Sequence, residues 1–302
     1  MSFSGDVRRE ICSYINDKDK KFACLYGMLL FCRKLSREKI SFQTESRTSA
    51  ETFSMLFKSV MHKEITFTDK KRKNGCVLYS FNTDNSDIIN SVFSVYHFTD
   101  DGRNIDYEMI STSSLGVFTA GVFLACGSVN DPNKEYHLEF ISPCESLADE
   151  LVSLLKDIGA NAKTAIRRNQ YVVYLKDSES IEDTLTFIGA PQCTLEIMNV
   201  KIYKDVRNKA NRITNCDSAN IDKVINAAMK QTEDIKLIIK TSGIESLNSE
   251  LREVALMRLE NVGMSLKDIG ENLSEPISRS GVNHRFRKIA KIADDIRKGA
   301  AN

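Results

Sequence analysis

The chain has 302 residues, of which 42% are hydrophobic and 27% are charged. That composition excludes wholesale disorder and fibrous architecture, and the length predicts about two domains. Because the sequence contains no run of about 18 apolar residues and does not open with a secretory signal, we expect a cytoplasmic protein that does not contact a membrane.

The net charge of +1 hides an uneven distribution of charge along the chain. Residues 201–302 contain 19 Lys and Arg against 14 Asp and Glu, whereas residues 1–200 contain 23 against 27. Seven basic and two acidic residues lie within 279–298. This local excess indicates a polyanionic partner, although a solvated helix face is the simpler explanation for most charge runs.

The sequence offers little to hold a metal or another cofactor. Eight cysteines stand singly without a CxxC pair, a pattern typical of reduced core thiols rather than of a disulfide framework or a zinc ribbon. The four histidines have no close acidic or cysteine partner in sequence, and the glycines are too far apart to form a nucleotide-binding loop. We therefore expect no cofactor.

Apolar periodicity in the first hundred residues predicts the order helix, strand, strand, helix, strand, strand, helix. The expected elements are a helix over 22–33, extended runs around 34 and over 40–45, a helix over 50–61, strands over 64–68 and 76–81, and a helix over 87–96.

The same order recurs about 94 residues later, the distance from Gly27 to Gly121. A pattern that recurs at a fixed offset predicts two similar half-domains, related by a pseudo-two-fold axis. The second set comprises a helix over 115–125, strands over 127–129 and 136–140, a helix over 145–158, strands over 163–167 and 171–175, and a helix over 181–188.

The first helix of each half carries a glycine in its interior, at Gly27 and at Gly121. Glycine costs about 1 kcal/mol relative to alanine there, so we expect these positions to allow a close approach of two helix backbones. The two helices resemble degenerate copies of the LAGLIDADG helix of homing endonucleases. In that family the paired helices form the interface between the halves, and each ends in a metal-binding carboxylate.

The carboxylate positions of that motif fall on Cys32 and Cys126 in this sequence. Cleavage of a phosphodiester in that fold needs carboxylate oxygens to hold hard divalent ions, and a buried neutral thiol does not replace them. We therefore expect no catalytic residue and no enzyme activity. Two core thiols are the simplest interpretation of the cysteines, and a mutual disulfide or a soft-metal site is the alternative.

The last third of the chain predicts an all-helical domain. A polar stretch around 211–217 suggests a linker, followed by a helix over 221–239. Asn248 is placed to cap a helix that Gly263 stops, and the spacing from Ser265 to Asp268 fits a capping box for a short second helix. A third helix begins at Ser278. This arrangement predicts a helix-turn-helix.

The third helix has one narrow apolar stripe and an opposite face that is polar and basic. The stripe is Val282, Phe286, Ile289, Ala293 and Ile296. An opposite face of this kind suits the major groove, where Asn grips adenine and Arg grips guanine, while Arg279 and Arg285 are better placed for phosphates. The residues expected to bind DNA are Arg279, Ser280, Asn283, His284, Arg285, Arg287, Lys288 and Lys291.

The duplicated front part and the helix-turn-helix together resemble the WhiA family of bacterial transcriptional regulators, over essentially the whole chain. Specific stretches include Ser2–Val7, Gly127–Pro132, Asn211–Asn220 and Ser278–Arg285. The resemblance implies a non-catalytic endonuclease-like fold joined to a DNA-binding module. It also implies association with other transcriptional regulators at promoters, and roles in sporulation or in cell division and chromosome segregation.

The expected fold is α+β, with a duplicated αββαββα domain over 1–205, divided into halves of about 1–105 and 106–205. A linker over 206–220 and a helix-turn-helix domain over 221–302 follow. The expected function is sequence-specific regulation of transcription at double-stranded promoter DNA, in a protein associated with the nucleoid. The alternatives are a LAGLIDADG-type homing endonuclease and a scaffold that senses a ligand or a partner.

Overall fold

The structure is a computed structural model that describes residues 2–72, 75–99 and 102–299. The chain divides into two compact units, Met1–Asp205 and Val206–Asn302. The fold class is α+β, as predicted, because the first unit mixes helices with antiparallel sheets and the second is helical in its described part.

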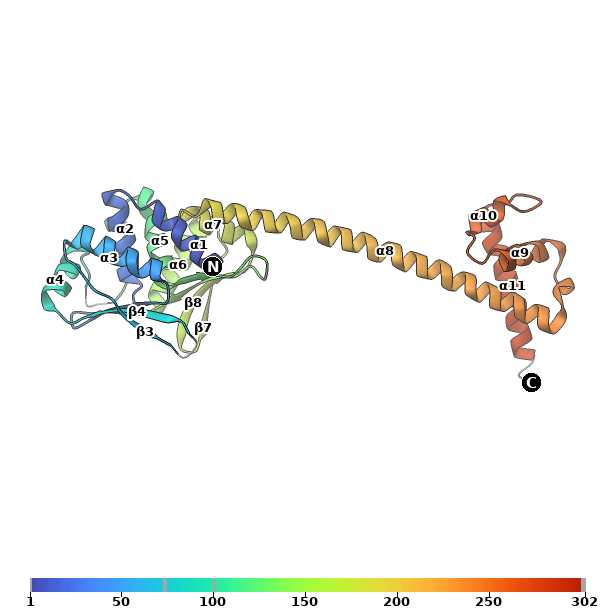
Figure 1. Ribbon diagram of the computed structural model, residues 1–302, viewed down its shortest axis with the longest axis horizontal. Coiled ribbons are helices and arrows are strands. Elements are labelled where there is room, and N and C mark those ends of the chain that lie inside the picture. The colour runs from blue at the N-terminus through green and yellow to red at the C-terminus, as the bar shows by residue number, and fades with distance from the viewer. Residues whose placement is uncertain (1, 73–74, 100–101, 300–302) are drawn as a thin grey trace. The chain divides into compact units, whose positions relative to one another are not determined.

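The first unit contains the predicted repeat, one copy of αββαββα after another (Figure 1). The first copy comprises α2 (Lys18–Leu30), β1 (Lys34–Leu35), β2 (Ile40–Thr44), α3 (Arg47–Met61), β3 (Thr68–Lys71), β4 (Val77–Thr83) and α4 (Ser86–Val95). The second comprises α5 (Leu115–Cys126), β5 (Gly127–Val129), β6 (Leu138–Ser142), α6 (Glu145–Asp157), β7 (Lys163–Arg167), β8 (Gln170–Leu175) and α7 (Ser178–Phe187).

The two copies form two four-stranded sheets with the same topology. The strand orders are β1-β2-β4-β3 and β5-β6-β8-β7, and every pairing is antiparallel. Within this unit the helices lie on one side of the strands in Figure 1. Two short 3-10 turns, Tyr107–Met109 and Thr112–Ser114, belong to the connection between the copies. The equal order of the sheets confirms the predicted duplication.

The glycines in the interiors of α2 and α5 let these two helices pack with their backbones in close contact. A Cβ added at Gly27 would collide with the carbonyl oxygen of Phe118, and one added at Gly121 would collide with that of Cys24. The packing reason expected for both glycines is therefore present. Around this contact a single hydrophobic core extends through both halves of the unit.

Several elements differ from the sequence prediction. Helix α1 (Phe3–Ser13) was not predicted, although Phe3, Val7 and Ile11 recur every four residues and are buried. Strand β3 lies at 68–71 instead of 64–68, because Ile65 and Phe67 pack against the core from a loop while the following exposed residues pair with β4. Helix α2 begins at Lys18, four residues before the predicted start at 22.

The polar segment over 206–220 is helical, so the helix expected to begin at 221 is the end of a much longer one. Helix α8 runs over Pro191–Ser242. Asn, Ser and Thr favour helices only weakly, but no Pro or Gly stands between 192 and 242, and nothing therefore breaks the helix. The contacts of the chain divide at 205/206, within this helix.

The second unit contains the last part of α8 and three further helices around a hydrophobic core of its own. A short 3-10 turn, Ile244–Ser246, leads to α9 (Ser249–Glu260), α10 (Leu266–Glu271) and α11 (Arg279–Gly299). Asn248 accepts a hydrogen bond from the backbone N–H of Leu251, and Ser265 accepts one from that of Asp268, as the capping patterns predicted.

Candidate nucleic-acid interface

Helix α11 begins where the sequence predicted, after a serine cap. The side chain of Ser278 accepts a hydrogen bond of 3.2 Å from the backbone N–H of Gly281, which satisfies one of the free donors at the helix start. Ile277 and Val282 both belong to the hydrophobic cluster of this unit, on either side of the cap, as a hydrophobic staple requires.

The apolar stripe of α11 forms its contact with the rest of the unit. Val282, Phe286, Ile289 and Ala293 are buried, and Ile296 packs against the same cluster while remaining partly exposed. Helix α11 contacts both α9 and α10 through this stripe. The orientation of the helix about its own axis is therefore the predicted one.

The opposite face of α11 is exposed to solvent. Six of the eight residues expected to bind DNA are exposed: Arg279, Ser280, His284, Arg287, Lys288 and Lys291. At about 100° per residue, Ser280, His284, Arg287 and Lys291 lie within about 40° of the direction opposite Val282. Asn283 lies on a flank and is half-buried. The helix thus presents three cations (Arg287, Lys288 and Lys291), one imidazole and a hydroxyl on this side, with Arg279 exposed at its start.

Arg285 differs from the other seven residues because it already has a protein partner. Its side chain is only 14% exposed, and its Nη2 lies 3.6 Å from a carboxylate oxygen of Glu250. This ion pair links α11 to the start of α9. The sequence alone placed Arg285 on a flank for phosphate contacts, whereas its surroundings in the fold suit a residue that holds two helices together.

The turn between α10 and α11 is held by backbone and carboxylate contacts. The N–H of Ile277 donates to the carbonyl of Gly270 at 3.0 Å, and a Cβ at Gly270 would collide with the carbonyl oxygen of Ile277. Both the N–H and the hydroxyl of Ser274 donate to Glu253, and these bonds lower the pKa of that carboxyl. The turn is longer than the tightest helix-turn-helix, yet it is well fixed.

A buried arginine of α9, which was not identified from the sequence, contacts the loop that follows this helix and an aromatic ring of α11. Arg258 is 2% exposed, and its Nη1 donates to the carbonyls of Val262 and Met264 at 2.9 and 2.6 Å. Its guanidinium also lies over the ring of Phe286, 5.4 Å from the centroid. Because Arg258 follows Leu251, Val254 and Ala255 at helical spacing, its place on the apolar stripe was the available signal.

In the first unit, two cysteines stand at the ends of α2 and α5, at the positions where the LAGLIDADG motif carries carboxylates. The thiol of Cys32 donates to the carbonyl of Lys34 at 3.1 Å, and that of Cys126 donates to the carbonyl of Val122 at 3.3 Å. Burial raises the pKa of Cys32 to about 11 and that of Cys126 to about 12. Both are free thiols in their neutral form, so the alternative of a mutual disulfide is wrong.

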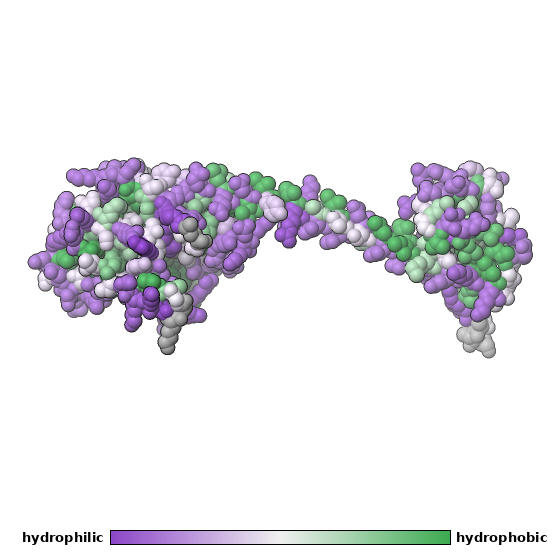
Figure 2. Space-filling view, viewed as in Figure 1, coloured by the Kyte–Doolittle hydropathy of each residue, from purple (hydrophilic) through white to green (hydrophobic). Residues whose placement is uncertain are grey.

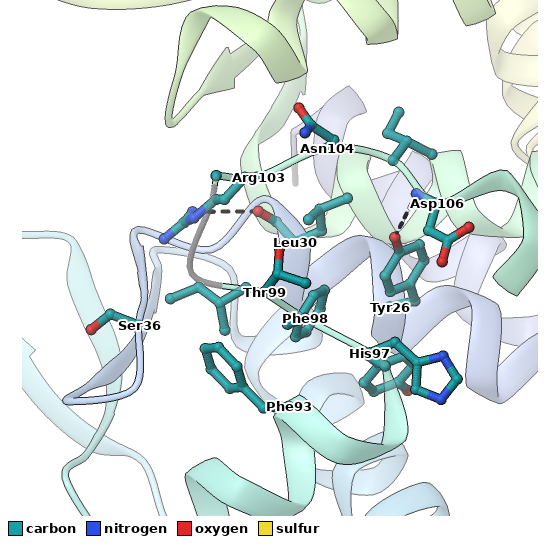
Figure 3. Close-up of a pocket in the computed structure, with 14 residues that line it drawn as sticks. Tyr26, Leu30, Ser36, Phe93, His97, Phe98, Thr99, Arg103, Asn104 and Asp106 are labelled. Atoms are coloured by element: carbon teal, nitrogen blue, oxygen red, sulfur yellow. Dashed lines mark hydrogen bonds between the residues drawn. The ribbon is translucent and has the colours of Figure 1, made fainter.

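Each of these helix ends is capped by an arginine. Arg103 donates to the carbonyls of Leu30 and Cys32 at 3.3 and 2.6 Å, as Figure 3 shows for Leu30. In the second copy, Arg8 of α1 donates to the carbonyl of Gly127 at 2.6 Å. Each guanidinium also exerts an electrostatic effect on the neighbouring cysteine, Arg103 on Cys32 and Arg8 on Cys126. A fixed positive charge therefore lies beside both positions.

Known proteins resemble this chain over its full length. A probable cell division protein WhiA from Clostridium perfringens (strain 13) is 37% identical and is covered, like this chain, over 99%. The chain belongs to the WhiA family. A homologue of the same name from Staphylococcus aureus (strain JH9) is 38% identical over 99% of this chain and 98% of its own length.

Family models and a solved structure agree with this assignment. The WhiA LAGLIDADG-like domain matches residues 115–207, and the WhiA C-terminal HTH domain matches residues 210–293. The crystal structure of full-length DUF199/WhiA from Thermatoga maritima is 25% identical, with a TM-score of 0.60, over 98% of this chain and 99% of that one. The LAGLIDADG-like fold and the helix-turn-helix are thus those of the family.

Two kinds of feature are absent from the residues that the structure describes. Within 2–72, 75–99 and 102–299, no group of three or more His, Cys, Asp and Glu side chains is arranged to hold a metal ion. None of the helices in the same ranges is both long and apolar enough to cross a membrane.

Proposed function

We propose that the protein is a sequence-specific, non-catalytic DNA-binding regulator of transcription. The observation that carries the proposal is that α11 exposes a basic face while its apolar face is buried on α9 and α10. This helix lies within the residues that match the WhiA C-terminal HTH domain. A helix held in this way enters the major groove and reads base edges. The ligand is double-stranded promoter DNA.

The residues of α11 divide between base edges and phosphates. Arg287 and Asn283 carry the groups that read guanine and adenine, with Ser280, His284, Lys288 and Lys291 beside them. Arg279 is exposed at the helix start and contacts phosphate. Because Arg285 is paired with Glu250, we assign it to the support of the helix rather than to sequence readout.

The absence of catalysis rests on the ends of α2 and α5. Neutral thiols stand at Cys32 and Cys126, and the guanidiniums of Arg103 and Arg8 lie beside them. A cation would have to approach an existing positive charge without a carboxylate to hold it. The homing-endonuclease alternative predicts Mg²⁺-dependent cleavage of duplex DNA by the pure protein, and we expect none.

The cellular role we propose follows the names of the relatives, which are called probable cell division proteins. Genes for cell division or chromosome segregation, and for sporulation where the organism sporulates, are the proposed targets. The protein would then lie on the nucleoid in the cytoplasm and act beside other transcriptional regulators. Mapping its bound genomic sites tests this role, because sites scattered without regard to such genes would contradict it.

The DNA-binding proposal is tested by two substitutions on α11. Arg287→Ala and Asn283→Ala should each relax sequence preference by about 1–3 kcal/mol at one base pair. Competition binding against a panel of single-base operator variants measures this preference. Lys240→Ala, an exposed cation near the end of α8, is the control and should leave the preference unchanged. If Arg285→Ala removed the preference while the other two did not, the proposed reading face would be wrong.

A further inference from the structure

A groove in the second unit lies beside the start of α11, and of the eight residues proposed to bind DNA Arg279 alone lines it. Its volume is about 470 Å³, within the range of small-molecule sites. The wall is formed by α8, the end of α9 and the first turns of α10 and α11. The lining includes Lys223, Val224, Leu266, Arg258, Lys267 and Arg279.

The floor of the groove is apolar and partly uncovered. Val224 is 55% exposed on α8, and Ala227 is exposed beside it. Met264 and Leu266 pack against the core of the unit and face the groove with their remaining surface. Apolar side chains gather along this part of α8 in Figure 2. Covering them with an apolar group would remove that surface from water.

Arg258 provides a buried positive charge in the wall without a counter-ion. Its Nε donates to Gln231 at 3.1 Å and its Nη1 to backbone carbonyls, and neither partner is charged. Among the described residues no carboxylate forms an ion pair with it, and no hydrogen bond engages its Nη2. Burial lowers the pKa of this guanidinium, which reflects the cost of holding the charge there. An anion in the groove would offset that cost.

The rim adds three further cations and no acid. Lys223, Lys267 and Arg279 line the opening, and none of the described lining residues is Asp or Glu. Lys267 approaches Glu271 at 3.6 Å, but both side chains are more than half exposed, so water screens this pair. The groove therefore combines an apolar floor with an uncompensated positive field.

We propose that this groove binds a small amphipathic anion, an apolar chain that ends in a single carboxylate or phosphate. The chain lies on Val224, Ala227 and Leu266, and the anionic group meets Arg258 and Arg279. Apolar burial provides the affinity, while the four cations select the sign of the charge.

Arg279 gives the site a consequence for DNA binding, and this step rests on the proposed function. The same guanidinium cannot contact a DNA phosphate and the bound anion at once. The anion therefore competes with DNA and acts as a negative effector. Free energy coupling of this kind is reciprocal, so DNA should weaken the binding of the anion by the same factor.

Binding of the anion is tested on the full chain without DNA. The probe is decanoate below its micellar concentration, titrated by calorimetry, with decyltrimethylammonium as the probe of equal chain length and opposite charge. We expect one decanoate to bind per chain. The cationic probe should bind at least about tenfold more weakly than decanoate. Equal affinities, or no saturable binding of decanoate, would overturn the proposal.

Two matched variants locate the site. Val224→Asp places a carboxylate on the floor and should weaken decanoate about tenfold or more through repulsion and lost apolar contact. Ile213→Asp is the control, because Ile213 is also 55% exposed on α8 but lies outside the groove. An equal effect of both variants would contradict the assignment. Thermal unfolding establishes that each variant folds.

The link to DNA is measured separately, by titrating labelled operator DNA at saturating decanoate. We expect weaker DNA binding by the original chain and no such change in Val224→Asp. If decanoate binds but DNA affinity stays the same, the competition at Arg279 is wrong. If DNA does not bind at all, the proposed function fails, while the calorimetry still decides whether the groove binds the anion.

Discussion

At the scale of single residues, Cys32 and Cys126 stand where the LAGLIDADG motif carries its metal-binding carboxylates. Both thiols are buried against backbone carbonyls, and their pKa values are raised by that burial. Arg103 and Arg8 cap the same helix ends. The sequence identified the missing acids, but the arginines come from distant segments, so only the fold brings them there.

Restoring the acids should not restore a metal site. In Cys32→Asp/Cys126→Asp we expect each new carboxylate to pair with Arg103 or Arg8 instead of a divalent ion, because the guanidinium is already in place. Calorimetry with Mn²⁺ and a cleavage assay on duplex DNA measure the outcome. Tight, stoichiometric Mn²⁺ binding by the double variant would show that the new carboxylates are free to hold a metal ion and are not paired with the two arginines.

The buried thiols also make the stability of the first unit depend on pH. The folded pKa is about 11 for Cys32 and about 12 for Cys126 and Cys193, against an ordinary value of 9.0. Above pH 9 the unfolded chain releases these protons while the folded chain retains them, so the free energy of unfolding falls as pH rises. Below that pH the contribution is constant.

Urea unfolding between about pH 8 and pH 11 measures this decline. Alkylation with iodoacetamide at about pH 8 provides an independent check. The exposed Cys216 should react first, and Cys32 and Cys126 only on unfolding. Rapid labelling of Cys126 in the folded protein would contradict the assignment of a neutral, shielded thiol.

At the scale of elements, the contact between α2 and α5 depends on two positions without side chains. Gly121 is bounded by the backbone of Cys24, and Gly27 by that of Phe118. Intrinsic helix propensity favours alanine at both positions by about 1 kcal/mol, but the neighbouring backbone leaves no room for a Cβ. Tertiary packing therefore overrides local preference at the interface between the halves.

Gly121→Ala should destabilise the first unit in spite of its gain in helix propensity. We expect a loss of about 1–3 kcal/mol or more, because the two backbones must move apart. Chemical denaturation followed by circular dichroism measures it. Ser153→Ala on the exposed side of α6 is the control and should be close to neutral. A stabilised Gly121→Ala variant would mean that the helices separate at little cost.

Helix α8 forms through a segment whose composition favours helices only weakly. Its polar segment over 206–220 suggested a linker, yet the helix continues without interruption to Ser242. Composition measures only the average preference of a segment, whereas a helix ends where a residue breaks it. In the same way the strand expected at 64–68 forms at 68–71, because pairing with β4 decides its register.

At the scale of the whole molecule, the two units carry different net charges and we expect them to divide the work. Residues 201–302 are basic overall and residues 1–200 are acidic overall. Neutralising phosphates requires clustered cations, which the second unit provides on α11. We expect the first unit to act as a scaffold, to contact a partner or to add weak contacts to the DNA backbone.

Separating the units should therefore separate the affinity for DNA. Val206–Asn302, which has its own hydrophobic core, should bind operator DNA, and Met1–Asp205 should bind it much more weakly. With about four phosphate contacts, the affinity of the second unit should fall about a hundredfold between about 50 and about 200 mM salt. Fluorescence anisotropy measures both quantities. Tighter binding by the first unit would reverse the assignment.

The sequence by itself determined the duplicated αββαββα order, the two interior glycines, the missing carboxylates and the apolar stripe of α11. These features are local or periodic, so they are written in the spacing of residues along the chain. Only the tertiary structure decided the distant partners of Arg8, Arg103, Arg258 and Arg285, which are Gly127, Cys32, Gln231 and Glu250. Each guanidinium meets groups from another segment, and spacing along one chain does not encode which distant segments fold against each other.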